Sequence, residues 1–155
     1  MSQDLTVKLA NQVAEADVLE FVAGVLDGAE LHPTYVYRPA DLNVYARPLD
    51  AEELADEPEV LGVRPRTRVV VQVLGGVPYE TYDAARVTAV RLALRCLERF
   101  GDGLVLSDYN ELVVLLRLGA TTTRNSLWYW DEYPQLAGLV AALPEAELTS
   151  PELTG

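Results

Sequence analysis

The chain has 155 residues, with 24 acidic and 12 basic side chains that give a formal net charge of -12, and half of its residues are hydrophobic. That hydrophobic share excludes an acidic disordered chain, and the charge argues against nucleic acid and anionic membranes as partners. No apolar stretch reaches the ~18 residues that span a bilayer, and the N-terminus lacks the pattern of a secretory signal, so we expect a cytoplasmic protein. The length predicts one domain over residues 1–144, followed by a flexible polar tail at 145–155.

The first half of the chain begins with an alternating apolar pattern that predicts a strand over residues 5–9. An apolar stripe at helical spacing predicts an amphipathic helix over 14–26. Residues 30–39 are expected to form a loop or a short extended piece, because two prolines punctuate them. Alternation predicts a second strand over 42–47, and one helical turn is expected at 51–54.

The second half begins with the clearest strand, over residues 67–74, whose run of valines is typical of a central position in a sheet. A long helix is predicted over 80–100, ended by two glycines. Two apolar segments, 104–106 and 112–118, predict a hairpin around a polar turn. The next residues, 121–125, are expected to form another turn.

The C-terminal part is predicted to hold a short aromatic strand over 126–130 and a last helix over roughly 133–142. The predicted order is therefore β-α-β-β-α-β-β-β-α. Mixed order with adjacent hairpins indicates an α+β fold, with a single mixed, largely antiparallel sheet and helices packed on one face.

The acidic residues gather in three places. The first place is the predicted helix 14–26, in a stretch between Lys8 and Arg38 that contains no Lys or Arg. The second is the part of the chain after Arg124, which contains no Lys or Arg either. The third is the segment 50–59. Between 50 and 59 six of ten residues are acidic, and we expect them to form either a solvated loop or a docking surface. A metal site is the least favoured alternative, because the segment lacks the ligand spacing and the central glycine of a calcium loop. These six are Asp50, Glu52, Glu53, Asp56, Glu57 and Glu59.

The aromatic residues supply the other candidates for partner binding. On a strand, Trp128 and Trp130 would share one face and Tyr129 would take the other. We expect one face to be core and the other to be open for binding, and Tyr45, Trp128 and Trp130 are the candidate anchors.

Catalytic chemistry is poorly supported. His32 is the only histidine and Cys96 the only cysteine, so they cannot supply a zinc shell unaided, and Cys96 beside a core stripe is expected to be a buried small hydrophobe. The pair Gly75–Gly76 lacks the flanking pattern of a phosphate loop and is expected to be a tight turn. The arginines at 91, 95 and 99 share one helix face, where we expect internal ion pairs. We expect no catalytic residue, cofactor or metal.

Four segments carry a family likeness: a Gly-x-Arg-Pro lead-in to a strand, a helix end with two glycines, a glutamate-led strand and a tryptophan segment. They read GVRPRTRVVVQV (62–73), RFGDGLVL (99–106), ELVVLLRL (111–118) and SLWYW (126–130). In these features the chain resembles the Sit-type immunity proteins, which neutralise antibacterial swarming-inhibition toxins. Two turns depart from that pattern, at Gly75–Gly76 and at Asp108–Tyr109–Asn110. The resemblance implies a role in bacterial competition with a toxin as partner, and it defines no catalytic residues.

Three hypotheses follow. The first is a non-enzymatic immunity protein whose acidic surface docks on a basic toxin, such as a nuclease. Complementary charge would speed this association and make it sensitive to salt. The second is a small α+β enzyme or ligand-binding domain that uses carboxylates and tyrosines, which predicts a concave pocket with perturbed carboxylates. The third is an adaptor or interaction module without a toxin partner.

Overall fold

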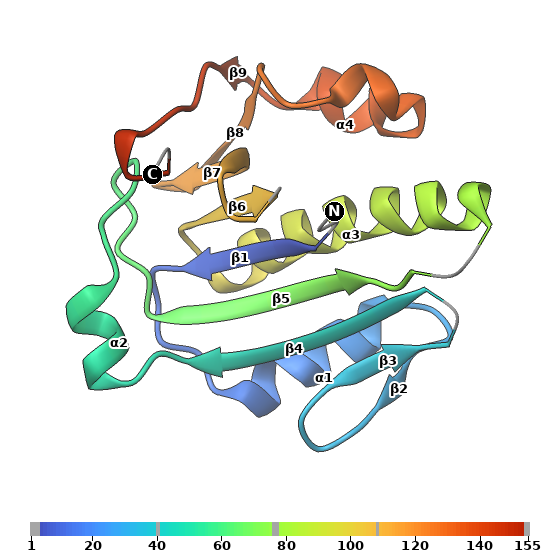
Figure 1. Ribbon diagram of the computed structural model, residues 1–155, viewed down its shortest axis with the longest axis horizontal. Helices are drawn as coiled ribbons and strands as arrows, with labels where there is room; N and C mark the ends of the chain where they lie inside the picture. Colours follow the sequence, from blue (N-terminus) through green and yellow to red (C-terminus); the bar gives the residue numbers. More distant parts are fainter. Residues whose placement is uncertain (1–3, 40, 76–77, 108, 154–155) are drawn as a thin grey trace.

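The computed structural model describes residues 4–39, 41–75, 78–107 and 109–153, and these form one open sheet with helices packed against it (Figure 1). Nine strands pair in the order β2-β3-β4-β5-β1-β6-β7-β8-β9 within the described residues. All neighbouring pairs are antiparallel except β8 and β9, so the predicted α+β class with a mixed, largely antiparallel sheet is confirmed. The strands are β1 (Leu5–Leu9), β2 (Glu30–Leu31), β3 (Val36–Arg38), β4 (Leu42–Pro48), β5 (Thr67–Val73), β6 (Gly103–Ser107), β7 (Leu112–Leu118), β8 (Thr121–Asn125) and β9 (Glu145–Ala146).

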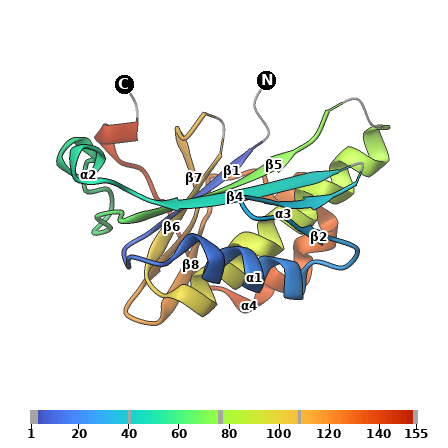
Figure 2. The same ribbon diagram turned by 90° about the horizontal axis from the view of Figure 1, so that it is seen from below.

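The two longest helices cover one face of this sheet. Figure 2 shows α1 (Glu15–Val25) and α3 (Tyr79–Phe100) on the same side of the strands, where α1 packs against β4 and α3 packs against β1 and β5. The short α2 (Ala51–Asp56) lies beyond the end of β4, and α4 (Ala137–Ala142) follows two 3-10 turns, Trp130–Glu132 and Pro134–Leu136. A third 3-10 turn is formed by Pro151–Leu153. Among the described residues, no helix combines the length and the apolar character that a membrane span requires.

The main core lies between the sheet and these helices. Leu5, Val7 and Leu9 point from β1 into it, because alternate side chains of a strand share one face. Val18 and Val22 meet them from α1. The valines of β5 at positions 69, 71 and 73 join the same cluster, as the predicted central strand requires.

A smaller apolar cluster covers the opposite face of the sheet over β6 and β7. Leu104 and Leu106 of β6 pack there against Val60 and Val63 from the loop after α2, and Leu148 comes from the C-terminal segment. Figure 1 shows this C-terminal segment beside the loop that follows α2. The opposite face is therefore closed over β6 and β7.

The connection from α3 to β6 shows why the glycines of this segment are needed. Gly101 has φ of 101°, a conformation that side chains with a Cβ rarely adopt. A Cβ on Gly103 would lie 2.7 Å from the carbonyl oxygen of Lys8 and 2.9 Å from Leu97. Asp102 adds a side-chain contact, since its carboxylate accepts a 3.0 Å hydrogen bond from the backbone N–H of Gly119.

Three local predictions differ from the structure. Residues 121–125, expected as a turn, form strand β8, because Thr121 to Arg124 pair with β7. Residues 126–130, expected as a strand, form turns that lead into a 3-10 turn. The segment 145–155, expected as a frayed tail, is attached to the sheet through residue 153: β9 pairs with β8, and Leu148 is buried.

Two expected turns lie partly outside the described residues. The turn at Gly75–Gly76 includes Gly76, and the turn at Asp108–Tyr109–Asn110 includes Asp108, neither of which the structure describes. Tyr109 and Asn110 have φ of 61° and 65°.

Candidate functional site

The acidic segment 50–59 is organised around α2, which begins with a capping box. The Asp50 side chain accepts a 2.9 Å hydrogen bond from the backbone N–H of Glu53, and the Glu53 side chain accepts one of 3.2 Å from the backbone N–H of Asp50. Such reciprocal bonds satisfy amide groups that a helix start leaves without partners. The sequence therefore starts a helix at this point, and Pro58 follows its end.

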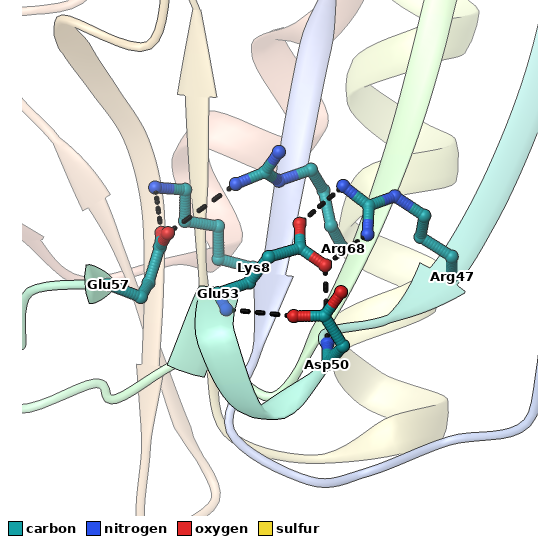
Figure 3. A network of polar contacts seen from close by, with 6 residues as sticks. All are labelled: Lys8, Arg47, Asp50, Glu53, Glu57 and Arg68. Atoms are coloured by element: carbon teal, nitrogen blue, oxygen red, sulfur yellow. Dashed lines mark hydrogen bonds and ion pairs between the residues drawn. The ribbon is translucent and has the colours of Figure 1, made fainter. Parts of the chain in front are cut away.

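Glu53 is also held by an arginine from the sheet. Arg47 of β4 donates from Nη1 and Nη2 to the two carboxylate oxygens of Glu53, both at 2.5 Å (Figure 3). This bidentate pair, followed by the backbone hydrogen bond from Asp50, lowers the pKa of Glu53 to about 2. Glu53 is therefore ionised at neutral pH, but its charge is matched by Arg47.

Glu57 links α2 to the central strands. Its Oε1 accepts a 2.5 Å hydrogen bond from Lys8 of β1, and its Oε2 lies 3.5 Å from Nη2 of Arg68 of β5 (Figure 3). Lys8 is only 9% exposed, so this carboxylate neutralises a largely buried cation. These pairs make Glu53 and Glu57 structural residues that attach α2 to the sheet.

The other four carboxylates of the segment remain open to solvent. Asp50, Glu52, Asp56 and Glu59 are exposed, and the ion pairs found among the described residues do not use them. Glu52 and Asp56 are four residues apart and share one face of α2. The acidic run is therefore divided into two residues that pair with basic side chains of the sheet and four exposed residues, of which Asp50 also caps α2.

Tyr45 lies on the sheet face opposite α1 and α3, close to the same network. It shares this face with Asn43 and Arg47, which are two residues away on either side along β4, and Tyr45 is 38% exposed. Tyr45 therefore lies near α2, because Arg47, two residues further along the same face of β4, binds Glu53 of that helix.

The two tryptophans lie elsewhere and are buried. Trp128 and Trp130 are 4% and 7% exposed, and their rings meet edge to face at 4.8 Å. The Trp128 indole donates to the Ser107 hydroxyl at 2.9 Å, and the Trp130 indole donates to the Asn125 carbonyl at 2.6 Å. Both rings belong to the core, so they offer little surface to a partner and are not used in the docking surface proposed below.

Sequence reasoning missed a buried arginine beside these rings. The guanidinium of Arg86 lies 5.8 Å from the centroid of Trp128 and 5.6 Å from that of Tyr133, within cation–π range. Its Nε and Nη2 are buried, without a hydrogen-bond partner. Burial raises the pKa of Tyr133, and the Arg86 charge opposes that shift. The signal in the sequence is a charged residue inside the apolar run 85–90.

The remaining polar candidates do not form a catalytic arrangement. His32 stacks on Tyr35 at 4.5 Å, with its Nε2 3.5 Å from Glu30. Cys96 is buried as expected, and desolvation raises the pKa of its thiol to about 12. No group of three potential metal-ligating side chains was found in the described part of the chain.

The arginine stripe on α3 was expected to form internal ion pairs. Instead, Arg91 donates to the backbone carbonyl of Gln135 at 2.6 Å, and the Arg99 guanidinium lies over the ring of Phe100 at 5.3 Å. The ion pairs found among the described residues do not include Arg91, Arg95 or Arg99.

Comparison with known proteins identifies the family. The family model described as SitI3-like matches residues 4–134, from the residue before β1 to the first residue of the second 3-10 turn. No curated protein and no solved structure matches the chain. Since the match covers most of the chain and agrees with the resemblance in the strand and turn motifs, the protein belongs to the SitI3-like family of Sit-type immunity proteins.

Proposed function

We propose that this chain protects its producer by binding a cognate antibacterial toxin without enzymatic chemistry, through the acidic surface of α2. Membership of the SitI3-like family carries the proposal, because immunity implies a toxin as the partner. The contact residues we propose are Asp50, Glu52, Asp56 and Glu59, with Tyr45 at the edge of this surface.

The division of the acidic run supports this choice of surface. Glu53 and Glu57 are matched by Arg47, Lys8 and Arg68, so α2 is held in place. Glu52 and Asp56 then project from a fixed helix, and Asp50 and Glu59 flank it, so that their charge can attract a basic protein and speed its association. A toxin with a basic contact surface fits this chemistry, and a nuclease is one such class.

A binding assay against the product of the adjacent gene tests the proposal. Wild-type protein should bind with an association rate that falls as salt rises from low to high concentration, because surface attraction is screened. The triple variant Glu52→Lys/Asp56→Lys/Glu59→Lys should weaken this binding by about tenfold or more. The matched control reverses the charge of three exposed acids outside this surface and so changes the net charge by the same amount. Its substitutions are Glu20→Lys, Glu98→Lys and Glu111→Lys.

Binding that is indifferent to salt and to the triple reversal would refute the acidic surface. Equal losses from the test and control triples would show that only overall charge matters.

The mechanism and place of action are separate parts of the proposal. A binding inhibitor should titrate the toxin stoichiometrically, whereas an enzyme should inactivate it at far lower ratios. Cell fractionation should find the protein in the cytoplasm, the compartment expected from the sequence.

A further inference from the structure

A second surface feature lies where the end of α1 meets the middle of α3, on the side of the sheet that these helices cover (Figure 2). A pocket of about 240 Å³ opens there between the two helices, and we call it the α1–α3 pocket. It is smaller than the pockets of about 300–1,000 Å³ that enclose a free small molecule, so it suits a single side chain of a larger partner. Its lining residues are Val25, Leu26, Thr88, Arg91, Leu92 and Arg95.

Two arginines and no carboxylate line this pocket, although the chain has a formal net charge of -12. Leu26 and Leu92 are each 4% exposed and close its base, while Val25 and Thr88 are half-buried walls. An apolar base keeps water away from one side of the guanidinium groups, and this strengthens their interaction with an anion. The α1–α3 pocket is therefore locally cationic, in contrast to the acidic surface of α2.

The two guanidinium groups of the pocket have unused donors. Arg91 donates from Nη2 to the carbonyl of Gln135 at 2.6 Å, which fixes its position, and its side chain makes no other hydrogen bond within the described residues. Arg95 is exposed, and its side chain makes neither a hydrogen bond nor an ion pair with the described part of the chain. Elsewhere Arg38 and Arg47 each pair with a nearby carboxylate. The pocket thus holds cations that the many acids of the chain leave unmatched.

The end of α1 offers a purely structural role for these charges. The last turn of α1 contains no basic residue, and cations beside a helix C-terminus stabilise it. If Arg91 and Arg95 served only this purpose, the pocket would bind no ligand. A binding role differs from the structural one because it requires saturable binding of an anion.

A guanidinium group selects a carboxylate by geometry as well as by charge. It is planar, and its N–H donors form a fixed fork that matches the two oxygens of a carboxylate. Arg91 and Arg95 are four residues apart on α3 and therefore lie on one face of the helix. A carboxylate placed between them can accept hydrogen bonds from both, whereas a neutral amide of the same shape lacks the charge that strengthens these bonds.

We propose that the α1–α3 pocket receives a carboxylate side chain of a protein partner, held between Arg91 and Arg95 above the apolar base. The partner that we assign is the toxin, so this inference rests on the proposed function. The pocket lies on the helix-covered side of the sheet, whereas Tyr45 beside the acidic surface lies on the other side. The chain would then present two contact regions of opposite charge, which orient a partner because a wrong orientation brings like charges together.

The first experiment tests the pocket without any toxin. Acetyl-glutamate amide is titrated into isotope-labelled full-length protein while the side-chain Nε–H signals of Arg91 and Arg95 are followed by NMR. We expect saturable millimolar binding of this probe. The neutral acetyl-glutamine amide, which has nearly the same shape, should give no saturable shift.

Two variants on the same helix make this test specific. Arg95→Gln should weaken binding of acetyl-glutamate amide by about fivefold, because a charge-assisted hydrogen bond is lost. Arg99→Gln removes the next arginine of the row, which lies over Phe100 and does not line the pocket, and should change binding by less than about twofold. Absence of a saturable shift at the two arginines, as a purely structural role requires, or equal effects of the two variants, overturns the proposal.

The second experiment asks whether the toxin uses the pocket. Arg95→Glu and the control Arg99→Glu both reverse an exposed arginine of α3 and make the chain more negative by the same amount. General attraction to a basic toxin should therefore not fall in either variant, whereas loss of a direct contact should weaken toxin binding by Arg95→Glu alone, by about tenfold.

The outcomes separate this inference from the proposed function. If wild-type protein binds the product of the adjacent gene and the two reversal variants bind it alike, the pocket is not a toxin contact and the inference fails. If wild-type protein binds no toxin, the proposed function fails instead, whereas the acetyl-glutamate amide titration still decides whether the pocket takes a carboxylate.

Discussion

Asn125 should control both the stability of the protein and the attachment of its C-terminal segment. Its side chain is fully buried at the end of β8. The amide nitrogen donates to the carbonyls of Val113 at 2.8 Å and Leu148 at 3.1 Å. The amide oxygen accepts from the backbone N–H of Leu127 at 3.2 Å and of Leu148 at 2.9 Å. One side chain therefore joins β7, the aromatic turn and the C-terminal segment.

The cost of Asn125→Ala follows from the groups that it leaves without partners. Each buried polar group that loses its hydrogen bond costs roughly 1–3 kcal/mol. The two groups on Leu148 can regain water if the C-terminal segment detaches, but that exposes a leucine whose burial is worth about 1.5–3 kcal/mol. The carbonyl of Val113 on β7 loses its 2.8 Å hydrogen bond from Asn125 in either case. We expect a loss of about 3 kcal/mol in the free energy of unfolding.

Chemical denaturation followed by tryptophan fluorescence measures this loss, and hydrogen exchange of residues 146–153 reports the attachment of the segment. The control is Asn43→Ala, which removes a half-buried amide bonded to Gln72 at 3.0 Å on the open sheet face and should cost less than about 1 kcal/mol. If Asn125→Ala stays as stable as Asn43→Ala, with unchanged exchange in the segment, the four hydrogen bonds do not hold it.

Three further predictions concern the α2 network and the cysteine. Glu57→Gln removes the charge that neutralises Lys8 and should lower the free energy of unfolding by about 2 kcal/mol. This loss is smaller than that for fully buried pairs, because solvent reaches part of the Lys8–Glu57 pair. An unchanged denaturation midpoint would contradict a stabilising role of the pair. Because the folded pKa of Glu53 lies at about 2, below its ordinary 4.5, its stabilising pair with Arg47 should be complete above pH 4.5 and lost as pH falls toward 2. The stability difference between wild type and Glu53→Gln should therefore shrink across that window, and a difference that is constant with pH would count against the pair. Cys96, with its thiol pKa raised to about 12 by burial, should react with a thiol reagent at pH 8 only as fast as the protein unfolds, and rapid labelling of the folded protein would show that the thiol is accessible.

Strong local patterns made several elements predictable. The valine run of β5 and the apolar stripe of α3 each match one periodicity over many residues, so the predicted ranges agree closely with Thr67–Val73 and Tyr79–Phe100. The polar strand β8 was missed because its sequence TTTRN has no apolar alternation, although β-branched threonine favours strands. The aromatic segment 126–130 was predicted to be a strand but forms turns, and Trp128 and Trp130 are buried although they do not belong to a strand.

The candidate site shows the same limit. The sequence located the acidic run at 50–59 and one helical turn within it, at 51–54. It did not reveal that Glu57 pairs with Lys8, 49 residues away, because such a contact depends on how β1 meets α2 in space. Hence it could not separate the carboxylates that hold the fold from those that face solvent.

By itself, the sequence determined the fold class, the main strands and helices, the acidic balance and the family likeness, because each is written in local periodicity, composition or short motifs. Only the tertiary structure decided which acids remain unmatched, that both tryptophans are buried, and that the C-terminal segment closes a second apolar cluster. These outcomes depend on long-range pairing, in which strands distant in sequence bring charges and apolar side chains together, and burial then determines which of them reach solvent.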